Sequence, residues 1–326
     1  MQGWFFMDAI KAKDITRHIF KDEDKGIAMM EELNLSDSIE VMTKIIPGLI
    51  NAAKEKGNVN DEGYFNSLYK IYNKVLVEKV KKADHLWMVY CDTTAYPYMV
   101  DDDLIVLYNY HNHEKVEQQL KKAGYKISLG IESPETFFNE IGHMYRNGYK
   151  NIRLTDGLTN DYKISREEFA TYDTFFKNED YVTNPGLQNS MISFFQEFRK
   201  EGKTETKEEI LKSHEILMFK AMKNAEYMVP CIKEETETEV SISHPFIDLT
   251  DKVSHAEGEQ IISVPVFTDG FEMDKCYKDQ HENMLYKFEE LIDLMNELEA
   301  SGIIINALGI SYFLSVENMK KINSEY

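Results

Sequence analysis

The stretch Tyr108–Lys115, with the sequence YNYHNHEK, raises the question of whether this chain binds a metal ion. His111 and His113 lie one residue apart beside a glutamate, and imidazole and carboxylate groups are common metal ligands. A catalytic metal needs three or four rigidly held ligands, whereas two side chains at this spacing supply at most two. We therefore expect no metal site and no cofactor. The competing structural interpretation is that His113 or Asn112 caps the helix that follows.

A second interpretation, an enzyme or small-ligand binder, stays open. It places a site at the carboxyl ends of strands in the first half of the chain, where open α/β sheets bind ligands. The groups available there are Asp101, Asp102, Asp103, Tyr110, His111, His113 and Asp156. The tripeptide Thr-Asp-Gly occurs at 155–157 and at 268–270, and we interpret both as tight turns with glycine at positive φ. No GxGxxG or GxxxxGK[ST] motif supports nucleotide binding.

The segment TAYPYMV, residues 94–100, offers a different kind of surface. Tyr96 and Tyr98 could contact a protein partner, because tyrosine buries a large area at a small cost in side-chain entropy. Core packing is the competing interpretation, and we expect it to hold.

Composition excludes several classes of partner. The 326 residues carry 57 acidic and 37 basic side chains, for a formal charge of -20, and a field of this sign repels nucleic acid and anionic membrane surfaces. The chain has three cysteines and no CxxC spacing. Such a sparse, odd number of cysteines is typical of proteins in a reducing compartment. Because the N-terminal stretch has neither signal-peptide nor membrane-anchor character, we expect a cytoplasmic protein.

Hydrophobic periodicity predicts a helical segment followed by α/β units. Apolar residues recur at helical spacing over 39–50 and 64–82, with KDEDKG (21–26) and KEKGNVNDEG (54–63) as predicted loops. Buried strands are expected over HLWMVYC, DDDLIVLYNY, YKISLGI and YKNIRLTDG, and helices over EKVEQQLKKAG and SPETFFNEIGHMYRNG. In the latter helix Ser133 is the expected cap, Pro134 the first residue and Gly148 the left-handed end. Its predicted buried stripe is Phe137, Phe138, Ile141, Met144 and Tyr145.

The same order of patterns recurs near the C-terminus, which predicts an internal duplication. Ala83 aligns with Ala225, Tyr108 with Phe267, and Ser165 with Ser315. Gly148 aligns with Gly302 at an offset of 154 residues (302 − 148). In this alignment the predicted helix that contains Phe137 corresponds to the one that contains Leu291. We expect a helical N-terminal segment (1–60), a first α/β module (61–172) and a second one (181–326). The segment EETETEVSISHP is expected to be an edge hairpin strand with a solvated charged end.

The second copy resembles a known family. Its NPGL helix start, AMKNAEYMVP and ISVPVFTDGFEM segments and terminal ASGIIINALGISYFLSVENM are similar to the SseB-like domain, named for enhanced serine sensitivity protein B of enteric bacteria. The departure is Ala307, where the family often has proline. The resemblance covers 181–326 well and 62–172 more weakly. It implies tandem α/β (α+β) modules of mixed sheet flanked by helices in a bacterial cytoplasmic protein, and it carries over no catalytic residue.

These observations favour a non-enzymatic accessory protein whose two modules form a surface for a protein partner. What the copies share is apolar residues and glycine, whereas a duplicated enzyme usually retains converging polar groups in one copy. Two alternatives stay open: the enzyme or ligand-binding site described above, and an acidic immunity-type protein that inhibits a basic toxin.

Overall fold

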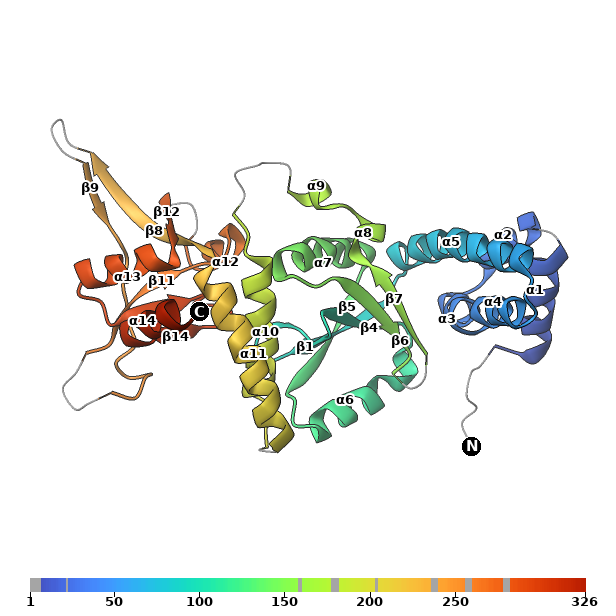
Figure 1. The fold of residues 1–326 in the computed structure, drawn as a ribbon, viewed down its shortest axis with the longest axis horizontal. Coiled ribbons are helices and arrows are strands. Elements are labelled where there is room, and N and C mark those ends of the chain that lie inside the picture. The colour runs from blue at the N-terminus through green and yellow to red at the C-terminus, as the bar shows by residue number, and fades with distance from the viewer. Residues whose placement is uncertain are drawn as a thin grey trace.

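The computed structural model describes residues 7–21, 23–157, 160–176, 182–202, 205–235, 240–255, 260–277 and 282–326. Within these ranges the chain is a mixed α/β protein, as the sequence predicts: helices flank mixed sheets, and a helical segment precedes them. Figure 1 shows the N-terminal helices at one end, a first sheet in the middle and a second sheet at the other end.

Helices alone build the N-terminal segment. They are α1 (Ala9–Lys21), α2 (Glu23–Glu32), α3 (Leu35–Glu40), the π-helix η1 (Val41–Ile45), α4 (Ile46–Glu55) and α5 (Val59–Lys81). The two predicted loops are shorter than expected, because α2 already begins at Glu23 and α5 at Val59. Asn58 explains the early start of α5, since its side chain accepts a hydrogen bond from the Asp61 N–H at 3.2 Å. The predicted loop residue Asp22 lies outside the described residues.

The first sheet follows α5, and the expected strands and helices appear in it. Its strands are β1 (Leu86–Cys91), β2 (Tyr96–Pro97), β3 (Met99–Val100), β4 (Asp103–Leu107), β5 (Ile127–Glu132), β6 (Asn151–Thr155) and β7 (Asp161–Ser165). Its helices are η2 (Tyr110–Asn112), α6 (His113–Lys122), α7 (Pro134–Asn147), α8 (Arg166–Phe169) and α9 (Tyr172–Phe175). One face packs on α7 and the other on α6, and each face has its own apolar cluster.

The second sheet begins after two long helices. The strands are β8 (Glu226–Glu235), β9 (Val240–Ser243), β10 (Ile247–Asp248), β11 (Ile262–Val266), β12 (Glu282–Lys287), β13 (Gly302–Ile305) and β14 (Tyr312–Ser315). The helices are α10 (Pro185–Phe198), α11 (Glu205–Lys223), α12 (Gly270–Asp274), α13 (Phe288–Glu297) and α14 (Val316–Glu325). Residues 236–239, part of the predicted edge hairpin, and residue 181, the predicted start of the second module, lie outside the described residues.

The second sheet consists of a four-stranded part, β10-β11-β13-β14, and a three-stranded part, β12-β8-β9, and five of its strands follow the same order and direction as five strands of the first sheet. In the first, β5, β1, β4, β6 and β7 are neighbours, and only the β4–β6 pair is parallel. In the second, β12, β8, β11, β13 and β14 are neighbours, and only β11–β13 is parallel. The β8–β11 contact is a single antiparallel bridge, Met228 with Phe267, closed by two 2.9 Å backbone hydrogen bonds. Ser165 and Ser315 both cap the helix after the last strand.

The two predicted partner glycines, however, have different roles. Gly148 ends α7 in the left-handed conformation with φ 76°, as predicted. After α13 that conformation belongs to Glu299, φ 52°, whereas Gly302 is the first residue of β13. A Cβ on Gly302 would lie 2.2 Å from the Leu314 carbonyl oxygen, so this glycine permits a close approach of strands. The predicted offset of 154 is therefore wrong for the helix ends, which are 151 residues apart (299 − 148).

The predicted stripe of α7 also needs one correction. Phe137, Ile141 and Met144 are each about 1% exposed, as expected. Phe138 is 39% exposed and contacts the ring of Phe175 at a centroid distance of 5.0 Å. It lies one residue after Phe137, about 100° round the helix, and so leaves the face that Phe137 buries.

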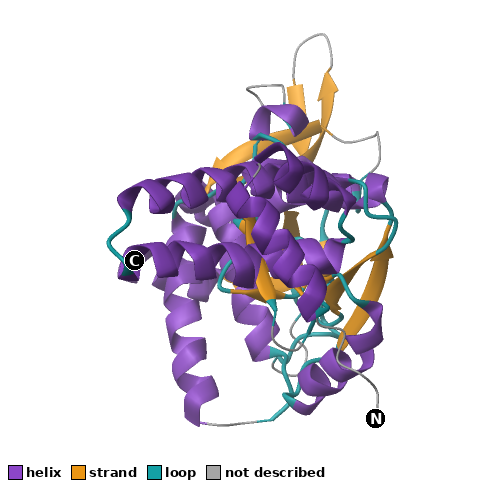
Figure 2. Cartoon of the chain, turned by 90° about the vertical axis from the view of Figure 1, so that its right-hand side faces the viewer, coloured by secondary structure: helices purple, strands orange, loops and turns teal. Residues whose placement is uncertain are grey.

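The α10 helix joins the two sheets. It packs against α7 and α11, and its Gln196 side chain holds both the N–H and the carbonyl of Met99 at 3.0 and 2.9 Å. Arg199 donates to the Thr93 carbonyl in the first sheet region and to the Ile310 carbonyl in the second. In Figures 1 and 2 the β8–β9 hairpin extends beyond these packed layers.

Candidate functional site

The predicted acidic triplet forms the turn between β3 and β4. Asp101 and Asp102 have left-handed φ values of 52° and 65°, which suit aspartate in a turn. Asp103 is fully buried, and its carboxylate contacts Lys163 Nζ at 2.6 Å and Arg153 Nη2 at 3.0 Å. The single buried carboxylate of the triplet is thus compensated by two basic side chains, one from β6 and one from β7.

The predicted histidines lie at the other end of β4. The five residues of that strand span about 13 Å, so the structure does not bring the triplet and the histidines together. His113 is the first residue of α6 and stacks on Trp87 at 6.0 Å. Asn112 occupies the cap position but makes no cap bond, because its side-chain amide donates to the Asp156 carbonyl at 2.9 Å. The prediction that one of these two side chains caps α6 is wrong.

Asp156 lies at the histidine end and organises a loop. Its carboxylate accepts hydrogen bonds from the backbone N–H of Asn160 at 3.1 Å and from the side-chain amide of Asn160 at 3.2 Å. Gly157, next to it, has φ 74°, as predicted for the first Thr-Asp-Gly turn. This carboxylate therefore links Asn160, which lies just before β7, to the end of β6.

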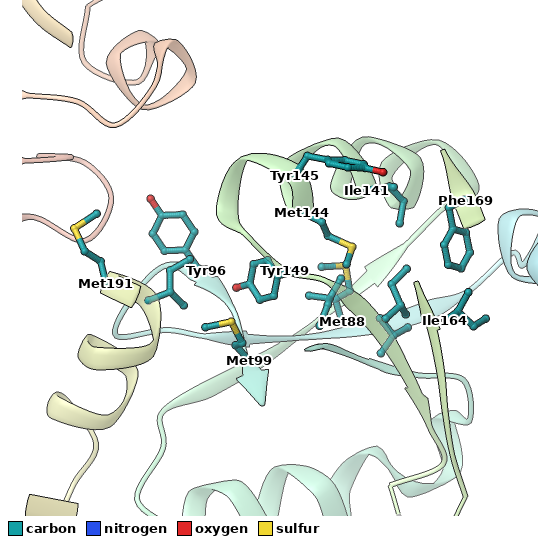
Figure 3. Close-up of a cluster of buried hydrophobic side chains, with 14 of the residues drawn as sticks. Met88, Tyr96, Met99, Ile141, Met144, Tyr145, Tyr149, Ile164, Phe169 and Met191 are labelled. Carbon is teal, nitrogen blue, oxygen red and sulfur yellow. The ribbon is translucent and has the colours of Figure 1, made fainter. Parts of the chain in front are cut away.

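The two candidate tyrosines are buried, in agreement with the core interpretation. Tyr98 packs edge-on against Tyr125 at 5.1 Å. Tyr96 is 3% exposed and lies on the side of the first sheet that faces α10 and the second module, as Figure 3 shows. Lys275 Nζ lies over the Tyr96 ring, 5.3 Å from the ring centroid. Tyr96 thus contributes to an interface inside the chain.

A group of charged side chains that the sequence did not reveal lies at this interface. We call Arg146, Asp269, Glu272 and Lys275 the inter-module cluster. Arg146 Nη1 donates to Asp269 Oδ2 at 3.0 Å and to Glu272 Oε1 at 2.8 Å. These three side chains are at most 3% exposed. Lys275, which is partly exposed, contacts both oxygens of Glu272 at 2.9 Å.

The local sequence explains how the carboxylates are positioned. Strand β11 ends at Val266, and Asp269 then caps α12, accepting the Glu272 N–H at 3.0 Å. The second Thr-Asp-Gly is therefore a helix start, and the prediction of a turn with Gly270 at positive φ is wrong. The spacing of Asp269 and Glu272 could have suggested a helix start at a strand end. Arg146 could not have been found this way, because it comes from the last turn of α7, 123 residues earlier.

Neutral polar groups complete the surroundings. Asn306 follows β13 with a left-handed φ of 49°, and its amide donates to Gln188 Oε1 at 2.9 Å. Its Oδ1 accepts the Thr268 N–H at 3.0 Å. Gln188 belongs to α10, so the carboxyl ends of β11 and β13 are tied to the helix that joins the modules.

Burial and charge act in opposite directions on the acids of the cluster. Burial opposes ionisation of Glu272, but Lys275 and Arg146 outweigh it and lower the pKa of this carboxyl. For Asp269 burial is the largest influence and raises the pKa, against the attraction of Arg146. His143 packs against Phe271 at 4.5 Å, and burial together with Arg146 and Lys275 lowers its pKa to about 4. His143 is therefore neutral at pH 7.

The chemistry of this arrangement is that of a closed ionic contact. Two carboxylates meet two cations, and Arg146 also lies 4.3 Å over the Phe271 ring. The ends of parallel strands, where α/β sheets bind ligands, are filled in the second module by α12 and by this arginine of the first. The cluster joins the modules and leaves its acids without an open face.

A second pair of acids lies near the edge of the first sheet. Glu132, at the end of β5, is 8% exposed and accepts a hydrogen bond from Tyr90 at 3.0 Å. Glu140 is on α7, and burial together with the charge of Glu132 raises its pKa to about 7. No ion pair of the described residues involves Glu132, and the charge of Arg146 offsets only part of the rise in the Glu140 pKa.

Three further findings bear on function. Within the described ranges, no three histidine, cysteine, aspartate or glutamate side chains are placed to share a metal ion. None of the described helices has the length and apolar character needed to cross a membrane. Comparison with known proteins finds no matching family model and no significantly similar curated protein or solved structure.

Proposed function

We propose that this chain is a non-enzymatic, cytoplasmic bacterial accessory protein that binds another protein, built from two SseB-like copies of one module. The duplication is supported by the shared strand order and by the equivalent helix caps Ser165 and Ser315. The family is supported by the motifs of the second copy and remains a proposal.

The observation that carries the proposal is the exposed hairpin of the second module. We define the arm as residues 232–235 and 240–246, which include the outer part of β8 and β9. Its side chains Ile232, Ile242 and Phe246 are 45%, 44% and 49% exposed. Figures 1 and 2 both show this hairpin projecting from the body, so a partner can reach it. Ile232 faces Ser243 and Ile242 faces Lys233 across the hairpin, so the two isoleucines lie on opposite faces, and each face exposes an apolar side chain that a partner could cover.

The charge around the arm indicates the chemistry of its partner. The sequence from 234 to 239 is EETETE, with four glutamates, and the whole chain has a formal charge of -20. A complementary surface would be apolar at its centre and rimmed by lysine and arginine. We propose a basic protein as the partner. The inter-module cluster serves this function by fixing the second module, and hence the arm, on the rest of the chain.

The test begins with capture and ends with purified proteins. A photo-crosslinking amino acid at position 242 should capture one basic protein in the cell, whereas the same group at Ile10, which is 77% exposed on α1, should not. The captured protein, purified, should bind the chain in a calorimetric titration, and the affinity should fall as salt is raised. The double variant Ile242→Asp/Phe246→Asp should bind much more weakly, with Ile10→Asp as the matched control.

Two results would contradict the proposal. The first is equal binding by the arm variant and the parent chain, which would place the partner elsewhere. The second is a failure of the purified candidate to bind at any salt concentration.

A further inference from the structure

The edge of the first sheet at β5 is a feature that the proposed function does not use. β5 pairs with β1 along all six of its residues, from Ile127–Cys91 to Glu132–Leu86. The ladder continues for one more residue, because Asp92 N donates to the Lys126 carbonyl at 2.9 Å. Among the described residues no strand pairs with the opposite side of β5. That side therefore presents a row of backbone N–H and carbonyl groups without a neighbouring strand.

The side chains of this edge do little to block pairing. Protein edges are usually protected by charges, proline or bulges. The middle of β5 has Ser128, Leu129 and Gly130 instead, and Ile131 is 56% exposed. The charged residues, Lys126 and Glu132, stand at the two ends. An unprotected edge of this kind needs a partner strand.

Symmetry sets a strict condition on pairing with a second copy. Two identical antiparallel strands are related by a twofold axis perpendicular to the sheet, which keeps every side chain on its own face. Facing residues must then be an even number of positions apart, because successive side chains alternate between faces.

The β5 segment meets this condition with the axis at Leu129. Lys126 then faces Glu132 of the second copy, and the pair occurs twice because of the symmetry. On the other face Ile127 meets Ile131, also twice, and Leu129 meets itself. One face of the new ladder is thus apolar, and the other ends in two pairs of opposite charge.

Other edge strands do not offer the same match. In β12 the opposite charges Glu282 and Lys287 are five positions apart, so symmetric pairing cannot bring them together. At β7, η1 of the N-terminal segment packs against the strand, and Lys163 is already held by the buried Asp103 at 2.6 Å. The β14 strand, Tyr312–Ser315, carries no charge.

The acidic side chains at the end of β5 also favour a second copy of this chain as the partner. Glu132 has no cationic partner among the described residues, and it lies close enough to Glu140 to influence its protonation. Lys126, 61% exposed in its side chain, makes only a surface contact with Glu201 at 3.3 Å. We propose that two copies of this chain associate through antiparallel pairing of β5 centred on Leu129, with Lys126 of each copy facing Glu132 of the other. This inference is independent of the arm and of any foreign partner.

A cysteine cross-link tests the register directly. In a Cys276→Ser background, Leu129→Cys should form a disulfide-linked dimer under mild oxidation, because facing Cα atoms lie about 5 Å apart. Ile131→Cys is the matched control. It is more exposed but faces Ile127, so its own symmetry mate lies roughly 13 Å along the strand and should not cross-link. The other two cysteines, Cys91 and Cys231, are buried.

Sedimentation equilibrium of the full chain tests the association itself. The parent should show a concentration-dependent dimer, and Lys126→Glu should raise the dissociation constant about tenfold or more by placing two glutamates opposite each other twice. Lys122→Glu, on the exposed end of α6, changes the charge equally and should leave the dimer unchanged. A monomer at every concentration would overturn the proposal, and so would a dimer that tolerates Lys126→Glu while Leu129→Cys fails to cross-link.

Discussion

At the scale of single residues, Asp103 and the inter-module cluster have neighbours of opposite charge, whereas Glu132 makes no ion pair among the described residues. Asp103 has two basic neighbours, and Arg146 has two acidic ones. Such contacts contribute modest net stability relative to apolar packing, but removing one partner leaves a buried charge alone. The structural role of each contact can therefore be measured by a single substitution.

Replacing Arg146 by methionine should be strongly destabilising. Asp269 and Glu272 would remain buried side by side with only Lys275 near them, and we expect a loss of about 3–5 kcal/mol in the free energy of unfolding. Urea denaturation measures this loss. Arg17→Met, on the exposed side of α1, is the control and should change stability by no more than about 0.5 kcal/mol. Equal stability of the two variants would show that the inter-module cluster does not hold the modules together.

Glu140 predicts a pH dependence of stability. Its folded pKa is about 7 against the usual 4.5, so between these values the folded protein keeps a proton that the unfolded chain has lost. Stability should therefore fall as pH rises from 4.5 to 7 and level off above. Glu140→Gln lacks this titration, so its stability relative to the parent should rise by up to about 3 kcal/mol across that window.

The control for this experiment is Glu135→Gln, on the exposed first turn of the same helix. Thermal or urea unfolding at several pH values gives both profiles. If Glu140→Gln and the parent change in parallel with pH, the carboxyl of Glu140 is not perturbed by burial.

At the scale of elements, α7 separates buried from exposed positions sharply. Phe137→Asp places a charge in the core and should cost several kcal/mol, enough to lose the first sheet. Phe138→Asp, next to it, should cost about 1 kcal/mol, because the Phe138 ring already lies partly in solvent and loses chiefly its contact with Phe175. Circular dichroism melts compare the two. Similar melting temperatures for the two variants would contradict the burial that we assign.

Much of the first module's element order was predictable because its signals are local. Buried strands such as β1 and β4 are continuous apolar runs, and Ser133, Pro134 and Gly148 mark the ends of α7. The alignment of helix ends failed for a physical reason. Offsets of 154 and 151 differ by three residues, nearly one helical turn, so both keep the apolar stripe on the same face.

The candidate site was less predictable because its parts are distant in sequence. Thr268, Asp269 and Glu272 are neighbours and form a readable helix start. Arg146 joins them only once α10 has placed the two modules together, and no local pattern contains that information. The first module's triplet and histidines were predicted as one possible site, but β4 holds them at its opposite ends.

At the scale of the whole molecule, the chain presents fixed modules and two outward-facing surfaces. The inter-module cluster and α10 fix the modules on each other, and the carboxyl ends of β11 and β13 are filled in consequence. The arm offers apolar side chains beside a run of glutamates, whereas the β5 edge offers backbone groups and self-complementary charges. We expect a different protein to bind the arm and a second copy of this chain to pair with the β5 edge.

Amide hydrogen exchange with and without the captured basic partner tests the proposed function most directly, because it locates the partner along the whole chain. We predict slower exchange in 232–235 and 240–246, and no change in 266–275 or 101–113. Protection of the strand ends at 266–275, or around His111 and His113, with an unaffected arm would contradict the account and favour a ligand site there.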